Sequence, residues 1–109
     1  MTQRIDEPVW PATMADPFVL QHDGAYWAYG TAPRDPVTGH EFRILRTTDL
    51  ISWEYHGGAL VPLNDPQVKG YWAPEVVAHG GRFLMFYSAG GAQGQGHGVR
   101  AAAASEPSG

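Results

Sequence analysis

The chain has 109 residues, carries a formal net charge of −4 and contains no cysteine. These features exclude a disulfide framework, a thiolate metal site and the basic patch that binding to nucleic acid requires. No apolar run is long enough to span a membrane, and residues 1–8 lack the apolar core of a signal peptide. We therefore expect a cytoplasmic protein that binds neither nucleic acid nor membranes, while secretion by another route stays open.

The first part of the chain, about residues 15–57, has the pattern of strands joined by turns. Asp23-Gly24 is a hairpin signal, because glycine accepts the positive φ that a primed turn requires. Aromatic residues, which suit a pleated surface, follow this turn at 26–29. A loop rich in proline and glycine comes next, and after it residues 42–47 alternate between the two faces of a strand. Strands are therefore expected at residues 18–21, 26–29, 42–47 and 52–55, with Trp53 and Tyr55 on the same side.

The second part, about residues 71–109, repeats this order of elements. Gly80-Gly81 takes the place of the first hairpin turn, and residues 83–87 are almost wholly apolar, as is typical of a strand buried on both faces. Propensity alone would make the alanine run 101–104 helical, but its place in the repeat favours a strand. Strands are therefore expected at residues 75–78, 83–87 and 99–104.

An internal repeat relates the two parts with an offset of 57 residues, the separation of Asp16 and Ala73. Residues 15–24 align with residues 72–81 without a gap. Strand-rich units that repeat in this way are typical of β-propeller blades, and we favour this interpretation over a β-sandwich with an accidental internal match. Two blades cannot close a propeller, so we expect exposed aromatic surface on the open sheet faces and further blades in a longer protein.

Asp16 is the strongest candidate for chemistry. It precedes Pro17, which favours an extended backbone, and it stands at the start of the innermost strand of its repeat. In a propeller such a strand lines the central channel, where a carboxylate can face a ligand. The position fits a functional carboxylate and an Asx-type cap of the strand equally well.

Glu75 and the aromatic residues before it are further candidates. Glu75 could bind a sugar hydroxyl or support Asp16, although a solvated carboxylate at a strand edge is slightly favoured. Tyr71 and Trp72 precede this strand, where an indole could form one wall of a sugar pocket or a wedge between blades.

Two pairs of histidines occupy matched positions of the repeat, His22 with His79 and His40 with His97. Matched positions on different blades need not converge, so we predict no metal site. The first pair is interpreted as hairpin residues that bond to the backbone. No Ser/His/Asp or Cys/His set for nucleophilic catalysis can be assembled.

Several segments, in this order along the chain, resemble glycoside hydrolase family 43. Residues 15–27, ADPFVLQHDGAYW, are similar to the opening of that family's domain, and residues 48–54, TDLISWE, resemble its S/T-x-D-L-x-x-W segment. Residues 71–76, YWAPEV, resemble the W-A-P-E/D-V segment that opens its second blade, and residues 99–107 resemble its V-x-V-A-x-S-x-x-P segment. The resemblance covers about residues 10–109.

The resemblance implies a five-bladed β-propeller, of which this chain supplies about the first two blades. It implies hydrolysis, with inversion, of arabinose- or xylose-containing plant polysaccharides and oligosaccharides, as by an α-L-arabinofuranosidase or β-xylosidase. Asp16 corresponds to the general base of the family. Trp72 and Ala73 correspond to its sugar subsite, and Glu75 to an acidic residue there that is not the general acid.

In the family, the general acid and a second aspartate that orients it come from later blades. We therefore expect both beyond residue 109, in missing C-terminal blades of the same enzyme, and we expect the chain alone to be inactive. No cofactor is expected of this chain. A central calcium ion, as found in some members, would belong to the full-length protein.

Two other functions stay open. One is a non-catalytic carbohydrate-binding propeller fragment that self-associates and has no need of Asp16. The other is a related five-bladed family that acts on fructans, against which the segment Trp72-Ala73-Pro74-Glu75 argues.

Overall fold

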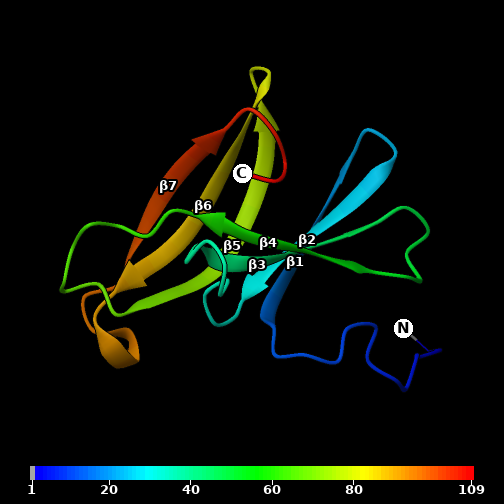
Figure 1. Ribbon diagram of the computed structural model, residues 1–109, viewed down its shortest axis with the longest axis horizontal. Helices are drawn as coiled ribbons and strands as arrows, with labels where there is room; N and C mark the ends of the chain where they lie inside the picture. The colour runs from blue at the N-terminus through cyan, green and yellow to red at the C-terminus, as the bar shows by residue number, and fades with distance from the viewer. Residues whose placement is uncertain (1) are drawn as a thin grey trace.

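The computed structural model describes residues 2–109 as two antiparallel β-sheets that pack face to face (Figure 1). The first sheet has the order β1 (Ala15–His22), β2 (Ala25–Thr31), β3 (Glu41–Thr47) and β4 (Glu54–Leu60). The second sheet has the order β5 (Gly70–His79), β6 (Arg82–Gly90) and β7 (Gly98–Ala104), with a short 3-10 helix, η1 (Ala92–Gly94), between β6 and β7. No helix among residues 2–109 has the length and apolar character needed to cross a membrane.

Both predicted hairpins are present, and their turns have the expected geometry. The two central residues have positive φ in each case, at Asp23 (51°) and Gly24 (77°) and at Gly80 (58°) and Gly81 (75°). Turns of this kind match the right-handed twist of the strands that they join. They set the register of β1 on β2 and of β5 on β6, in which His22 pairs with Ala25 and His79 with Arg82.

The alanine run forms strand β7, as the repeat predicts. It pairs with β6 along its whole length, from Gly98 opposite Ala89 to Ala104 opposite Phe83. Tertiary pairing thus overrides the helix propensity of alanine, which is a weak preference.

The predicted fourth strand is displaced. Residues 52–55 were expected to form it, whereas β4 begins at Glu54 and continues to Leu60. The reason is a turn held by side chains, in which Asp49 Oδ1 accepts hydrogen bonds from the backbone N–H groups of Ile51 and Ser52 at 2.9 Å. These hydrogen bonds, from Ser52 first, lower the pKa of Asp49 and keep the chain out of a strand until the turn has ended.

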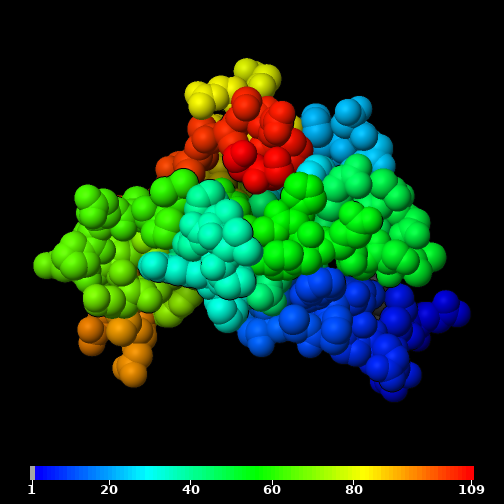
Figure 2. Space-filling model, in the orientation of Figure 1, coloured from blue at the N-terminus to red at the C-terminus, as the bar shows by residue number. Residues whose placement is uncertain are grey.

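The core is a single apolar layer between the two sheets. Ile44 is 0 % exposed and packs in it with aromatic residues of both sheets, including an edge-to-face contact of Phe42 with Tyr87. The sides of the sheets that face each other supply most of the rest of this layer, and Val68 comes from the segment before β5. The sheet residues are Tyr29, Leu60, Tyr71, Val76, Phe83, Met85 and Ala89. Figure 2 shows the last residues of the chain (red) lying across the junction of the two sheets.

The two outer faces differ in their cover. On the first sheet, the N-terminal segment lies over β3 and β4, where Trp10 stacks on Tyr55 and the Arg43 guanidinium donates to the Thr13 carbonyl at 2.6 Å. Trp53 lines a hollow together with Trp10, so Trp53 and Tyr55 share this side, as predicted.

The outer face of the second sheet is open. The prediction that residues 83–87 are buried on both faces is wrong, because Phe86 is 43 % exposed and Leu84 is only partly covered. Val77 and Val99 are exposed on the same side. Val77 pairs with Leu84 and Val99 with Ser88, and both partners alternate along β6 with the residues that face the core. The expectation of exposed aromatic surface on an open sheet face is therefore confirmed at Phe86.

Ile44→Ala should lower the free energy of unfolding by roughly 2–5 kcal/mol, because the lost methyl groups leave a cavity between the sheets. Chemical denaturation would measure this. Val37→Ala, at a position that is 90 % exposed, is the control and should change stability by less than about 0.5 kcal/mol. Equal effects of the two substitutions would contradict this account of the core.

Asp35 should make stability depend on pH in the acid range. Hydrogen bonds from the Tyr55 hydroxyl, and then from the backbone and side chain of Thr38, lower its pKa to about 2. Because this pKa lies below that of the unfolded chain, the stabilisation is present above about pH 4 and is lost as the pH falls toward 2. The unfolding temperatures of the wild type and Asp35→Asn should therefore differ by a constant amount above about pH 4 and converge as the pH falls from about 4 toward 2. A difference that is independent of pH over this range would refute this role.

Candidate functional site

Two β-bulges lie at matched positions of the repeat. The pairing of β1 with β2 shifts between Ala15 and Phe18, and that of β5 with β6 shifts between Trp72 and Glu75. Each shift contains one non-glycine residue with left-handed φ, Asp16 at 50° and Ala73 at 52°. Such a backbone costs of the order of 1 kcal/mol or more and is kept only where the surrounding structure enforces it.

The first bulge gives Asp16 its orientation. The expectation of an extended backbone before Pro17 is wrong, because the bulge takes Asp16 out of the regular ladder and turns its φ to the left-handed region. Its carboxylate also does not cap the strand, since its partner is the hydroxyl of Thr31, which donates to Asp16 Oδ2 at 3.0 Å. Asp16 is exposed, so its carboxylate has access to water.

The two bulges meet because β1 and β5 are neighbours across the sheet interface. Together they form one open hollow of about 250 Å³, which the following residues line: Asp16, Pro17, Phe18, Ala73, Pro74 and Glu75. The structure therefore brings together three of the sequence-predicted site residues, Asp16, Ala73 and Glu75. The Ala73 N–H donates to the same Thr31 hydroxyl at 2.9 Å, which ties the two bulges to each other.

Trp72, the remaining predicted residue, lies beside this hollow and not among the residues that line it. Its indole, 36 % exposed, stacks on the His97 ring with the ring centroids 4.1 Å apart. The loop after β6 curves round the indole, and a side chain at Gly94, where φ is +84°, would lie 3.1 Å from the Trp72 ring. The loop is thus shaped to hold the tryptophan.

The His97 ring is itself fixed by two hydrogen bonds. Nε2 lies 3.0 Å from the carbonyl oxygen of Gly91, which can only accept, so Nε2 donates. Nδ1 lies 2.7 Å from the Ser88 hydroxyl oxygen and, in the neutral ring, accepts the hydroxyl proton. In the sequence, His97 stands out as the repeat partner of His40. Its position directly before β7, where antiparallel pairing brings it near Ser88 and Gly90, was the available signal.

The matched histidines His22 and His79 line one hollow between the two hairpins. His22 lies at the first hairpin, as predicted, but its ring packs edge-to-face on Phe83 of the second sheet and not on the backbone. His40 Nδ1 lies 3.3 Å from the Gly58 carbonyl oxygen.

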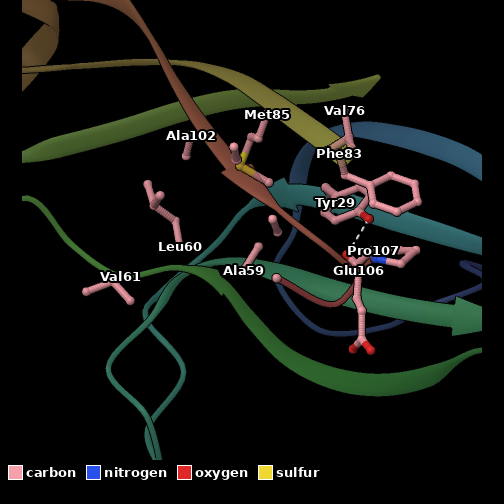
Figure 3. A pocket seen from close by; sticks show the side chains of 13 residues that line it. Tyr29, Ala59, Leu60, Val61, Val76, Phe83, Met85, Ala102, Glu106 and Pro107 are labelled. Atoms are coloured by element: carbon pink, nitrogen blue, oxygen red, sulfur yellow. Dashed lines mark hydrogen bonds between the residues drawn. The ribbon is translucent and has the colours of Figure 1, made fainter. Parts of the chain in front are cut away.

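A second, larger hollow lies between the sheets, away from Asp16 (Figure 3). Its volume is about 290 Å³, and its walls are mostly apolar, with Leu60, Val76 and Met85 among them. The Tyr29 hydroxyl beside it donates to the Pro107 carbonyl at 2.5 Å, and burial raises the pKa of Tyr29. The only acidic group on its wall, Glu106, points its carboxylate away, so this space is a gap in the core packing and no place for acid–base chemistry.

Residues 5–109 match the sequence model of glycosyl hydrolases family 43. A thermostable family-43 glycoside hydrolase has 29 % sequence identity and a TM-score of 0.72, with 88 % of this chain and 30 % of that chain covered. No curated protein sequence matches the chain significantly.

Two further solved structures show the same fold at lower sequence identity. For an endo-arabinase from Bacteroides thetaiotaomicron, the identity is 22 % and the TM-score 0.73, with 98 % of this chain and 36 % of that chain covered. For a family-43 β-xylosidase/α-arabinofuranosidase from a compost microbial metagenome, the identity is 21 % and the TM-score is 0.74. The match covers 94 % of this chain and 35 % of that chain. The chain thus spans about a third of these proteins, and the prediction of roughly two blades of a five-bladed β-propeller is confirmed.

Trp72 and His97 should be energetically coupled, because stacked rings contribute about 0.5–1.5 kcal/mol beyond their buried area. A double-mutant cycle with Trp72→Ala and His97→Ala, measured by chemical denaturation, should give a coupling of about 1 kcal/mol. A cycle of Trp72→Ala with His79→Ala, an exposed histidine at a hairpin, should give none. Additive effects of Trp72→Ala and His97→Ala would show that the stack is not an energetic unit.

Proposed function

The chain belongs to glycoside hydrolase family 43, and we propose that it supplies the general base, Asp16, of an inverting glycosidase that acts on arabinose- or xylose-containing oligosaccharides. The observation that carries this proposal is an exposed carboxylate at a strained bulge, in one hollow with Ala73 and Glu75. Strained backbone and bulges that re-aim a side chain are concentrated at functional sites.

The proposed reaction needs two carboxyl groups in different protonation states. Asp16, as carboxylate, takes a proton from a water molecule whose oxygen forms the new bond to the anomeric carbon. The bond from that carbon to the leaving oxygen breaks, and a carboxylic acid on the other face of the sugar gives this oxygen a proton. Such groups stand about 6.5–9.5 Å apart, so that the water fits between the base and the sugar.

We assign the general acid to other blades of a longer protein and not to Glu75. Glu75 lines the same hollow as Asp16 and lies where the second bulge ends, two residues after Ala73, where it suits a hydrogen bond to a sugar hydroxyl. Trp72 offers a partly exposed, rigidly held indole beside the hollow, and such a ring suits stacking on a sugar. Within this proposal, a central calcium ion would belong to the full-length protein and not to this chain alone.

A second candidate function is a carbohydrate-binding fragment that associates with itself. The exposed apolar residues on the outer face of the second sheet, Val77, Phe86 and Val99, favour it, because a second copy could cover them. The same face would also accept the next blade of a propeller. Such a binder would not need the carboxylate of Asp16.

Asp16→Asn in the complete propeller should reduce kcat on an aryl arabinoside or xyloside by about 100- to 10,000-fold, the usual contribution of a general base. Asp23→Asn is the matched control, because it makes the same change at another exposed aspartate and an Asn-Gly turn suits the hairpin equally well. The 109-residue chain alone should show no hydrolysis. Full activity of Asp16→Asn would exclude Asp16 as base and favour the binding function, whereas hydrolysis by the isolated chain would show that the acid lies within it.

A further inference from the structure

We propose that Thr31 is a positioning residue of this site: its hydroxyl fixes the Asp16 carboxylate and couples it to the backbone of the segment 72–75 in the second sheet. This inference depends on the proposed function, since the orientation of Asp16 affects the reaction only if Asp16 is the base. It adds a residue that the motifs in the sequence do not mark.

The direction of both hydrogen bonds follows from the chemistry of the groups. A carboxylate only accepts and a backbone N–H only donates, so the single hydroxyl proton of Thr31 goes to Asp16 Oδ2 and its lone pair receives the Ala73 N–H. The distances are 3.0 Å and 2.9 Å, both within the normal range. With both partners bound, the hydroxyl cannot rotate to another partner, and Asp16 Oδ2 is held in one place.

Both bulges need this hydroxyl. Thr31 ends β2 directly opposite Ala15, so its side chain reaches the carboxylate that the first bulge has turned aside. The second bulge takes Ala73 out of the β5–β6 ladder, and its N–H then requires another acceptor. Thr31 is only partly buried, so we attribute its role to the hydrogen bonds of its hydroxyl and not to packing in the core.

The arrangement leaves the other half of the carboxylate for chemistry. Asp16 Oδ1 has no hydrogen-bond partner within residues 2–109, so it can accept a proton from water while Oδ2 is restrained. If a bound sugar displaced the segment 72–75, the Thr31 hydroxyl would move with the Ala73 N–H and shift the Asp16 carboxylate. Thr31 should therefore affect the chemical step and not the affinity for substrate.

The test compares Thr31→Val, which keeps the shape and removes the hydroxyl, with Thr31→Ser, which keeps the hydroxyl. In the intact protein that carries this chain, Thr31→Val should lower kcat by about 10- to 100-fold, the usual effect of misplacing a catalytic group, with KM within about twofold. Thr31→Ser should retain at least about half of kcat. In the 109-residue chain, exchange of the Ala73 amide measured by NMR should be about tenfold faster in Thr31→Val and unchanged in Thr31→Ser.

The outcomes separate this inference from the proposed function. If Asp16→Asn is inactive but Thr31→Val has wild-type kcat, the inference is wrong and the proposed function stands. Equal losses in Thr31→Val and Thr31→Ser would also overturn it, because the hydroxyl would then not be responsible. If Asp16→Asn stays active, the proposed function fails, and the catalytic role of Thr31 fails with it even where the Ala73 exchange confirms the hydrogen bond.

Discussion

The apolar layer between the two sheets is the contact on which the other features depend. A sheet must bury its apolar face against another element, and side chains such as Ile44 and Tyr87 are buried where the two sheets meet. The same packing sets β1 beside β5. It therefore brings the strand starts of the two repeat units together, and with them Asp16 and Ala73, which lie far apart in the sequence.

Strain at these strand starts has a structural cause and a chemical use. A left-handed backbone is unfavourable at Ala73, whose side chain offers no compensating hydrogen bond, and it persists at the position that matches Asp16 in the repeat. The bulges release one backbone N–H and redirect one carboxylate, and the Thr31 hydroxyl joins the two. The rigid sheets thus hold an exposed acidic group without burying it, so that it stays both fixed and accessible to water.

The two sheets are not equally complete as structural units. The N-terminal segment covers the outer face of the first sheet through Trp10 and Arg43, whereas the outer face of the second sheet remains apolar and open at Phe86. In repeat architectures each unit buries its apolar face against the next one, so an open face marks a place where another unit or another molecule can pack. The site lies elsewhere, in the open hollow where the two bulges meet.

Turn residues and a fixed repeat are local or periodic signals, so the succession of strands along the chain, the two primed turns and the strand identity of the alanine run could be predicted from the sequence. It also singled out Asp16, Ala73 and Glu75, which the fold brings together. Only the tertiary structure decided the left-handed backbone of Asp16, the later start of β4, the stack of His97 on Trp72 and the bond from Ala73 to Thr31, 42 residues away. These features depend on which side chains the packed sheets and the folded loops leave within hydrogen-bonding or stacking distance, and no pattern along the chain encodes that distance.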